Sequence, residues 1–289
     1  MRAASGPGFR EVCRARPLLG TRVEIRAGGD AAEEDLHAAV DLAFAAVERV
    51  HRLMSYHDPG SELTRLNRHA GAAPQRVSAG TLAVLEAALH FARLSEGAFD
   101  PGVAATLEQW GYLPKIGAAP PAGSWRDVEV TPDGCVRFHR PVRLDLGGIA
   151  KGFAVDLAVR TLREAGVEAV VVDAGGDLRV AGIVPRRIGL RDPRAPAGSV
   201  HSVDLENAAL ATSAGYFSRR WDGERYVSAL VDPASAQPFL AGSSVSVRAF
   251  DCMTADALTK VVLFAPPAVA ERALAQCEAH AFVQASPGP

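Results

Sequence analysis

The chain has 289 residues, 48% of them apolar and 22% charged, with a formal net charge of −2. This composition is typical of a globular protein and excludes a largely disordered one. Lys and Arg are scattered without a basic patch, which argues against a nucleic-acid partner. No apolar run reaches the ~20 residues of a membrane span.

The N-terminal region carries no apolar stretch of the kind found in signal peptides and no lipoprotein cleavage pattern, so we predict a cytoplasmic protein. The four cysteines of the whole chain lie outside any CxxC spacing, and we expect free buried thiols in a reducing compartment. Residues 1–16 are expected to form a flexible segment, residues 17–283 a single domain or two closely packed subdomains, and residues 284–289 a frayed tail.

Hydrophobic periodicity predicts a strand and then helices in the first third of the chain. Apolar and polar residues alternate over 21–27, which is typical of a half-buried strand. Asp30 is expected to cap the long amphipathic helix that follows. The predicted helices span 31–54, 62–67 and 78–95, the last with Ser78 as its N-cap.

The rest of the chain mixes short strands with helices. A Pro-Asp-Gly turn predicts a hairpin between 128–130 and 135–138, and the apolar run 170–172 predicts a buried strand. Further strands are expected at 142–146, 178–183, 187–190, 199–205, 226–231 and 243–249, and further helices at 149–165, 254–264 and 268–280. Because some strands alternate with helices (βαβ) and others form hairpins, we predict an α+β or mixed α/β fold with mixed sheets and packed helices.

Residues 145–153, DLGGIAKGF, join a predicted strand to a helix through two glycines. Gly147 and Gly148 permit a close approach of the backbone to a ligand, and the N–H groups at a helix start attract phosphate. Lys151 falls in the first helical turn, where the helix dipole disfavours a cation, and a bound phosphate would offset that cost. The alternative is an ordinary strand–loop–helix connection with an exposed lysine, and the segment alone leaves both open.

Two turns present further carboxylates. In 170–182, VVVDAGGDLRVAG, Asp173 and Asp177 flank a Gly-Gly turn that is either a ligand-binding loop or a plain hairpin. In 228–238, SALVDPASAQP, Asp232 precedes Pro and is either a functional carboxylate or a turn former. In isolation, the plain turn is favoured in both segments.

Residues 251–260, DCMTADALTK, place hard oxygen donors at a helix start. Asp256 and Thr259 are three residues apart and share one helix face. A carboxylate and a hydroxyl suit Mg²⁺ beside a phosphate. The alternative is ordinary helix capping.

Residues 97–112, GAFDPGVAATLEQWGY, combine an Asp-Pro-Gly turn with two aromatic residues. Trp110 and Tyr112 could stack on a flat ring. The alternative is that both belong to the apolar core.

Taken together, these segments resemble the ApbE family, the FAD:protein FMN transferases. Seven segments match in the family's order between residues 19 and 264: LLGTRVEI, MSYHDPGSELTRLN, GAFDPGVA, DLGGIAKGFAVD, VVDAGGDLRVAG, ALATSAGYFSRR and DCMTADALTK. Each is weakly specific alone, but seven in order argue against a chance match.

The resemblance implies the ApbE fold and an enzyme that transfers FMN from FAD to a Thr or Ser hydroxyl of a target protein, releasing AMP. It implies FAD as the substrate, Mg²⁺ as the cofactor and an acceptor protein of a redox or electron-transfer system. The implied contacts of the flavin nucleotide are His57, Ala98, Phe99, Asp100, Asp145, Lys151 and Ala229. The implied Mg²⁺ ligands are the Gly148 carbonyl, Asp256 and Thr259, and the candidate catalytic residues are Lys151 and Asp232.

Two departures from the family pattern affect the transfer step. His57 stands where the family usually has Tyr, and Ala229 stands where its HIIDP motif has His. The acceptor hydroxyl needs a group to take its proton. Without the family histidine, Asp232 and His57 are the hypotheses for that group.

A third departure affects the metal site. The family's Thr four residues after the metal-binding Asp is Lys260 here, and Thr259 lies one position early. One residue rotates a helical side chain by roughly 100°. Thr259 could still reach the metal, or Lys260 could replace some of its charge.

Other activities would use the same residues. One is an FAD pyrophosphatase, in which water attacks and FMN and AMP are released. Another is a flavin carrier that binds FAD without turnover. A third is a magnesium-dependent nucleotide phosphotransferase that uses the two glycine-rich loops.

Overall fold

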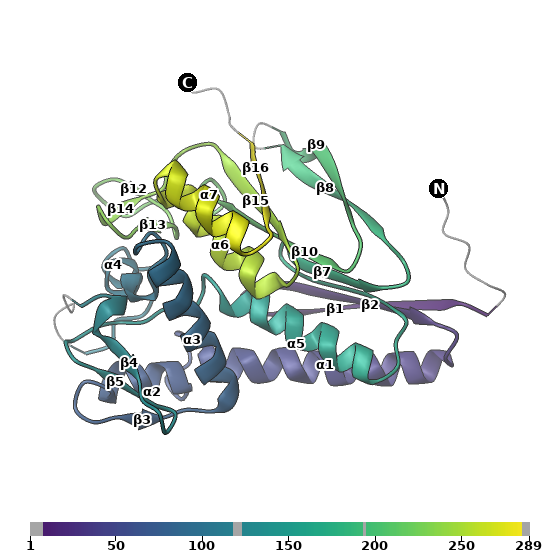
Figure 1. The fold of residues 1–289 in the computed structure, drawn as a ribbon, viewed down its shortest axis with the longest axis horizontal. Coiled ribbons are helices and arrows are strands. Elements are labelled where there is room, and N and C mark those ends of the chain that lie inside the picture. Colours follow the sequence, from purple (N-terminus) through teal and green to yellow (C-terminus); the bar gives the residue numbers. More distant parts are fainter. Residues whose placement is uncertain (1–7, 118–122, 193–194, 285–289) are drawn as a thin grey trace.

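A computed structural model of the chain describes residues 8–117, 123–192 and 195–284 (Figure 1). Its main sheet has seven strands, and each neighbouring pair is antiparallel. In spatial order the strands are β1 (Arg10–Leu18), β2 (Thr21–Gly29), β6 (Ala169–Ala174), β7 (Asp177–Gly182), β10 (Ala208–Ala214), β15 (Ser244–Ala249) and β16 (His280–Gln284). The α+β prediction is confirmed, whereas no βαβ unit forms in this sheet.

Three helices cover one face of the main sheet: α1 (Glu33–Met54), α5 (Ala150–Glu164) and α6 (Cys252–Phe264). Figure 1 shows α5 alongside α1. The predicted apolar stripe of α1 is buried, with Leu36, Val40 and Phe44 at most 1% exposed. This face therefore carries the main apolar core.

A long hairpin, β8 (Arg186–Asp192) and β9 (Ala195–Leu205), packs against the opposite face. Successive strand residues point to opposite faces. In β7, Leu178 and Val180 accordingly pack against the hairpin, whereas Asp177 and Arg179 face the helices and pair with residues of α5. This alternation carries the Asp177 carboxylate to the start of α5.

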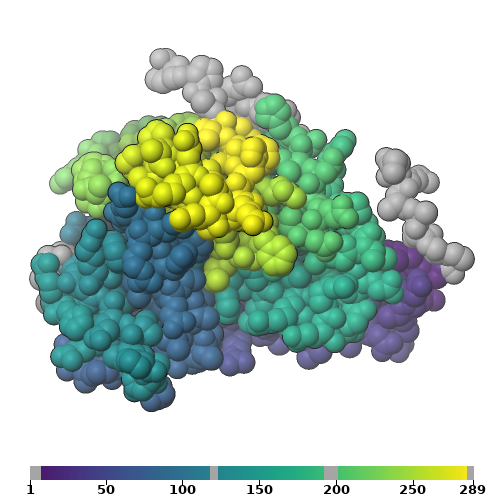
Figure 2. All heavy atoms as spheres, in the orientation of Figure 1, coloured from purple at the N-terminus to yellow at the C-terminus, as the bar shows by residue number. Residues whose placement is uncertain are grey.

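A second region lies beside the sheet and consists of short elements. They are α2 (Glu62–His69), α3 (Ala79–Leu94), α4 (Ala104–Gln109), two 3-10 turns (Pro101–Val103 and Trp125–Asp127) and the small sheet of β3 (Gln75–Arg76), β5 (Cys135–Phe138) and β4 (Val128–Val130). Ser78 caps α3 as predicted, since its hydroxyl accepts from the Thr81 N–H. Figure 2 shows α7 (Pro267–Gln276), in yellow, against this blue region, where Arg272 pairs with Glu96 at 2.7 Å.

Short ribbons complete the edge near the second region: β11 (Arg220–Trp221), β12 (Tyr226–Val227), β13 (Val231–Asp232) and β14 (Gln237–Pro238). A small apolar cluster of Leu107, Trp110, Val227 and Val231 joins them to α4. The strand predicted at 226–231 is therefore wrong as one element. Its middle is irregular because the Ser228 hydroxyl bonds the carbonyls of Leu230 and Phe239.

The chain ends differ from the prediction. Residues 10–16 are part of β1, paired along their length with β2, so the flexible segment predicted for 1–16 is wrong there. Gln284 likewise ends β16 and is 8% exposed. Residues 1–7 and 285–289 lie outside the described part, as do 118–122 of the connection after α4.

Four local predictions also fail. Asp30 does not cap α1, which begins after Ala32 without a side-chain cap. The strand predicted at 142–146 does not form, because the Leu144 backbone bonds the side-chain amide of Asn67 instead of a neighbouring strand. The helix predicted to reach residue 280 ends at Gln276. The cysteines are free, but only Cys252 is buried.

Among the described residues, no helix combines the length and apolar character needed to cross a bilayer.

Candidate functional site

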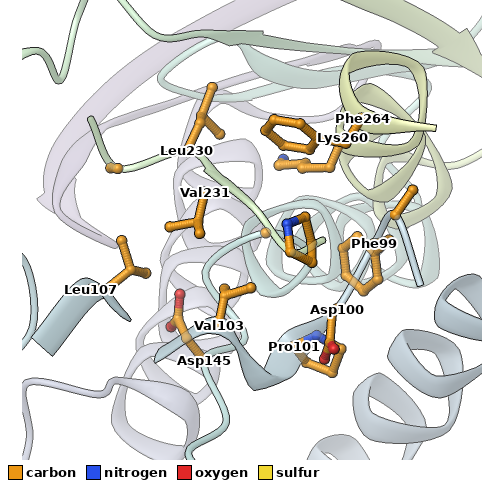
Figure 3. Close-up of a pocket in the computed structure, with 14 residues that line it drawn as sticks. Phe99, Asp100, Pro101, Val103, Leu107, Asp145, Leu230, Val231, Lys260 and Phe264 are labelled. Carbon is orange, nitrogen blue, oxygen red and sulfur yellow. The ribbon is translucent and has the colours of Figure 1, made fainter. Parts of the chain in front are cut away.

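Two adjoining pockets meet at the glycine loop before α5. The first has an empty volume of about 480 Å³ and lies between the 98–107 segment, the 229–233 segment and α6 (Figure 3). The second, of about 1210 Å³, lies between the end of α1, the 55–58 loop and the start of α5. Asp145 lines both pockets. An elongated ligand could therefore run from one pocket to the other past this loop.

The loop itself is held by local hydrogen bonds. The Asp145 carboxylate accepts from the Gly147 N–H at 3.0 Å, and the Asp145 N–H donates to the Pro101 carbonyl at 2.8 Å. The N–H groups of Ile149 and Ala150 both donate to the Leu146 carbonyl and start the helix. Burial raises the pKa of Asp145, although the Gly147 N–H and nearby positive charges oppose that effect.

Gly152 allows α5 to approach the start of α6. A Cβ atom at this position would lie 2.3 Å from the Cys252 carbonyl oxygen, which no side chain tolerates. The close approach brings the Gly152 N–H to 3.3 Å from the Asp256 carboxylate. Asp256 therefore supplies an internal anion at the N-terminus of α5, where the helix dipole favours one.

Two lysines and two aspartates form a buried charge cluster beside the loop: Lys151, Asp177, Asp256 and Lys260. Lys151 Nζ pairs with Asp177 and lies 3.5 Å from Asp256 Oδ2. Lys260 Nζ pairs with Asp256 Oδ1 and lies 2.9 Å from the Asp256 carbonyl oxygen. The aspartate side chains are at most 5% exposed, and those of Lys151 and Lys260 are 31% and 13% exposed.

The groups of the charge cluster shift one another's pKa values. Burial by itself would raise the pKa of Asp256, but the ammonium groups of Lys151 and Lys260 outweigh it and lower that pKa. Burial and the charge of Asp256 raise the pKa of Asp177 against the opposing effect of Lys151. Burial would lower the pKa of Lys151, yet its two aspartate partners raise it, so its ammonium stays charged at neutral pH.

The cluster explains how a lysine is accommodated in the first turn of α5. A cation in the first turn of α5 is unfavourable toward the helix dipole, and two carboxylates of the protein offset that cost. A ligand phosphate is therefore not required to explain this lysine. Asp177 was identified in the sequence only as part of a turn, and the strand alternation of β7 brings it here.

The three predicted magnesium ligands do not converge on a cation site. Both oxygens of Asp256 already accept bonds, one from Lys260 and the other from Lys151 and Gly152. Thr259 is fully buried; its hydroxyl bonds Ser213 Oγ at 2.7 Å and donates to the Asp256 carbonyl at 2.7 Å. Gly148 lies against the Lys260 side chain, whose Cε would be 3.5 Å from a Cβ at position 148. The donor set thus suits an ammonium group better than a divalent cation.

Within residues 8–117, 123–192 and 195–284, no group of three or more His, Cys, Asp or Glu side chains is arranged to hold a metal ion.

The predicted stretch Ala98, Phe99 and Asp100 lines the first pocket, with Phe99 on the side away from Leu107 of α4 in Figure 3. The Asp100 carboxylate also has a structural role. Its Oδ1 accepts the N–H groups of Gly102 at 2.6 Å and Trp125 at 3.1 Å. Burial raises the pKa of Asp100 to about 6 against these bonds.

The residues predicted for the transfer step are more scattered. Ala229 is exposed and lines the first pocket, and His57 is exposed and lines the second. Asp232 lines neither: its carboxylate accepts from the Ala234 N–H at 3.0 Å and the Ser235 hydroxyl at 2.5 Å of its own turn. This geometry favours the turn-forming interpretation and does not support the prediction of Asp232 as a catalytic residue.

The two candidate stacking aromatics also lie outside both pockets. Trp110 is 6% exposed within the apolar cluster under the ribbons. The Tyr112 hydroxyl donates to the carbonyl of Ser218 and lies 3.2 Å from that of Val227. Both belong to the packing between α4 and the ribbons. Phe264, one turn beyond Lys260, instead supplies an aromatic ring to the first pocket; its place on the pocket-lining face of α6 could not be predicted from the sequence.

The fold places the chain in a known structural class. The chain is similar over 95% of its length to the crystal structure of the ApbE protein from Thermotoga maritima, with a TM-score of 0.84, 26% identity and 94% of that chain covered. It is similar over 95% of its length to the flavin transferase ApbE from Vibrio cholerae, with a TM-score of 0.76, 28% identity and 93% of that chain covered. This is the class of proteins with the fold of ApbE flavin transferases.

The ApbE family model matches residues 19–283, and the chain belongs to the ApbE family. An FAD:protein FMN transferase of Vibrio cholerae is 30% identical, with 91% of this chain and 83% of that protein covered. One of Treponema pallidum is 29% identical, with 86% of this chain and 77% of that protein covered. The family resemblance predicted from the seven segments is confirmed.

Proposed function

We propose that this chain is an FAD:protein FMN transferase that attaches FMN to a Thr or Ser hydroxyl of an acceptor protein and releases AMP. One observation carries the proposal. Two pockets share Asp145 at the glycine loop, with Lys151 lining one pocket and Lys260 the other. FAD is two ring systems joined by a pyrophosphate, so it matches two pockets that meet at one loop, each lined by the ammonium-bearing side chain of a lysine.

The chemistry is a displacement at phosphorus. The acceptor hydroxyl oxygen attacks the phosphorus of the FMN half, an O–P bond forms, and the bond to the AMP phosphate breaks. Negative charge grows on the phosphoryl oxygens and the leaving AMP. The ammonium groups of Lys151 and Lys260 would stabilise that charge within a partly buried site. The magnesium dependence predicted from the sequence is not carried into this proposal, because the donor set around Asp256 already holds ammonium groups.

The proton of the acceptor hydroxyl leaves to a base, for which His57 is our candidate. It is exposed and lines the second pocket together with Asp145 and Lys151, and a neutral imidazole has a ring nitrogen that can accept a proton. His57→Ala is expected to lower kcat by about tenfold to a hundredfold, with a smaller change in the affinity for FAD. Loss of transfer in Asp232→Asn but not in His57→Ala would instead assign the base to Asp232.

The acceptor is expected to belong to a redox or electron-transfer system, where covalent FMN has a use, and the protein is expected to act in the cytoplasm. The decisive experiment incubates the full chain with FAD and a purified candidate acceptor, then denatures the mixture. Flavin fluorescence on the denatured acceptor, with AMP released in equal amount, supports transfer. Free FMN and AMP with an unlabelled acceptor supports the pyrophosphatase instead. FAD that binds but stays intact with every acceptor supports a carrier and contradicts the transferase.

A further inference from the structure

We propose that the ammonium group of Lys260 takes the place of a divalent cation in this chain, so that FAD is bound without Mg²⁺. The inference rests on the proposed function, since it concerns how the same site holds the FAD pyrophosphate. It begins from the geometry of α6. Asp256 and Lys260 are one helical turn apart and therefore share a face.

Lys260 Nζ is held by two oxygens of one residue. It bonds the carboxylate of Asp256 and, at 2.9 Å, the carbonyl oxygen of Asp256. Both are hard oxygen donors of the kind that would otherwise coordinate Mg²⁺. The Lys260 side chain is only 13% exposed, so the ammonium lies inside the site and does not extend into solvent.

The charge count of the cluster decides which cation fits. Two carboxylates face two ammonium groups, Lys151 and Lys260, so the four groups of the cluster balance, while the Asp145 carboxylate lies within electrostatic reach of both lysines. A Mg²⁺ ion would add two positive charges next to both ammonium groups in a poorly screened environment, where like charges repel strongly. With a hydroxyl residue at position 260, the same cluster would carry one net negative charge and offer a free carboxylate oxygen. The residue at 260 therefore determines whether a metal ion is needed.

The position of Lys260 suits direct contact with a pyrophosphate. It lines the first pocket, and its aliphatic chain lies against the glycine loop at Gly148. An ammonium group has three N–H donors, and the bonds to Asp256 use two. The third remains for a ligand oxygen. Lys151 lines the second pocket in the same way, with two of its donors used by Asp177 and Asp256.

The test compares FAD binding with EDTA and with excess Mg²⁺, by flavin fluorescence or titration calorimetry on the full chain without any acceptor. The wild type is expected to bind FAD equally in both conditions. Mn²⁺ binding, followed by electron paramagnetic resonance, is expected to show no stoichiometric site. Lys260→Thr is expected to bind FAD about tenfold or more weakly in EDTA, because a charge-assisted contact is lost. Mg²⁺ should restore its binding, and a Mn²⁺ site should appear.

Lys260→Met is the matched control, since it keeps the length of the side chain but offers neither charge nor oxygen. It is expected to lose FAD affinity in EDTA as Lys260→Thr does, but without recovery in Mg²⁺. Circular dichroism checks that each variant is folded.

The comparison on the wild type does not depend on any variant. Wild-type binding that needs Mg²⁺, or a stoichiometric Mn²⁺ site in the wild type, would overturn the inference and leave the proposed function standing. A wild type that binds FAD in neither condition would overturn the proposed function and the inference with it.

Discussion

The charge cluster and the transfer rim, defined as His57, Ala229 and Asp232, are built in opposite ways. The cluster lies between α5, α6 and β7, and its carboxylates are almost fully buried and bonded on both oxygens. The rim lies on a loop and on short ribbons, with His57 and Ala229 exposed. Under the proposed function, the dinucleotide is held by side chains of the core, whereas the acceptor protein meets loops that tolerate change.

The same contrast holds for the two positions at which the sequence departs from the expected family pattern. Ala229, where the resemblance implies a histidine, is exposed, and a substitution there disturbs little packing. Lys260, where the resemblance implies a threonine, lies inside the cluster and pairs with Asp256 of the same helix.

The largest expected effect comes from removing the centre of the cluster. Asp256→Ala leaves two partly buried ammonium groups without their shared partner and is expected to cost about 3–5 kcal/mol of the free energy of unfolding. Urea unfolding measures it. Asp232→Asn on the rim is the matched control for loss of a carboxylate. Equal costs for the two variants would contradict the contrast between cluster and rim.

The next effect tests the close approach that assembles the cluster. Gly152→Ala places a Cβ 2.3 Å from the Cys252 carbonyl oxygen and is expected to destabilise the protein by about 1–3 kcal/mol, despite the better helix propensity of Ala. Gly71→Ala, where nothing lies within 4 Å of the new atom, serves as the control. Thermal unfolding should separate them clearly, and a Gly152→Ala variant as stable as wild type would show that the helices can move apart freely.

A third effect concerns pH at the first pocket. The pKa of Asp100 is raised by burial to about 6 in the folded protein, above its ordinary value of 3.8. The folded state therefore binds more protons than the unfolded state between these values, and this group costs stability as pH rises from about 4 to about 6.

Asp100→Asn removes that titration and keeps the Oδ1 acceptor for Gly102 and Trp125. The free energy of unfolding of Asp100→Asn relative to wild type should therefore rise by about 1–3 kcal/mol between pH 4 and pH 7. Unfolding by urea at several pH values measures the difference. A difference that does not vary with pH would show that Asp100 titrates normally.

The smallest effect belongs to the rim itself. Asp232→Asn keeps one oxygen that can accept from the Ala234 N–H of the turn and loses only part of a local turn network. It is expected to change the free energy of unfolding by less than about 1 kcal/mol. Chemical unfolding checks this. A loss above about 2 kcal/mol would show that Asp232 contributes to the free energy of unfolding as strongly as a residue of the cluster.

Much of the local structure could be predicted from the sequence because it depends on short-range pattern. The stripe of Leu36, Val40 and Phe44 predicts α1, and the Ser78 hydroxyl predicts the start of α3. Predictions failed where residues far away in the sequence determine the backbone hydrogen bonds of a segment. The 142–146 segment has strand-like residues, but Asn67 takes the bonds of Leu144 that a strand would use. β1 was missed for the same reason: residues 10–16 become a strand only because β2 lies beside them.

By itself, the sequence determined the α+β class, the family and the segments that make the site, since each depends on local spacing and on motifs in a given order. Only the tertiary structure decided how those segments share charge. Lys151, Asp177 and the Asp256–Lys260 pair of α6 are far apart along the chain, and their balance depends on the alternation of β7 and on the close contact that Gly152 permits. Electrostatic energy depends on distance and burial in three dimensions. The motif therefore left Thr259 and Lys260 as alternatives, and only the fold shows Lys260 paired with Asp256 and Thr259 bonded to Ser213.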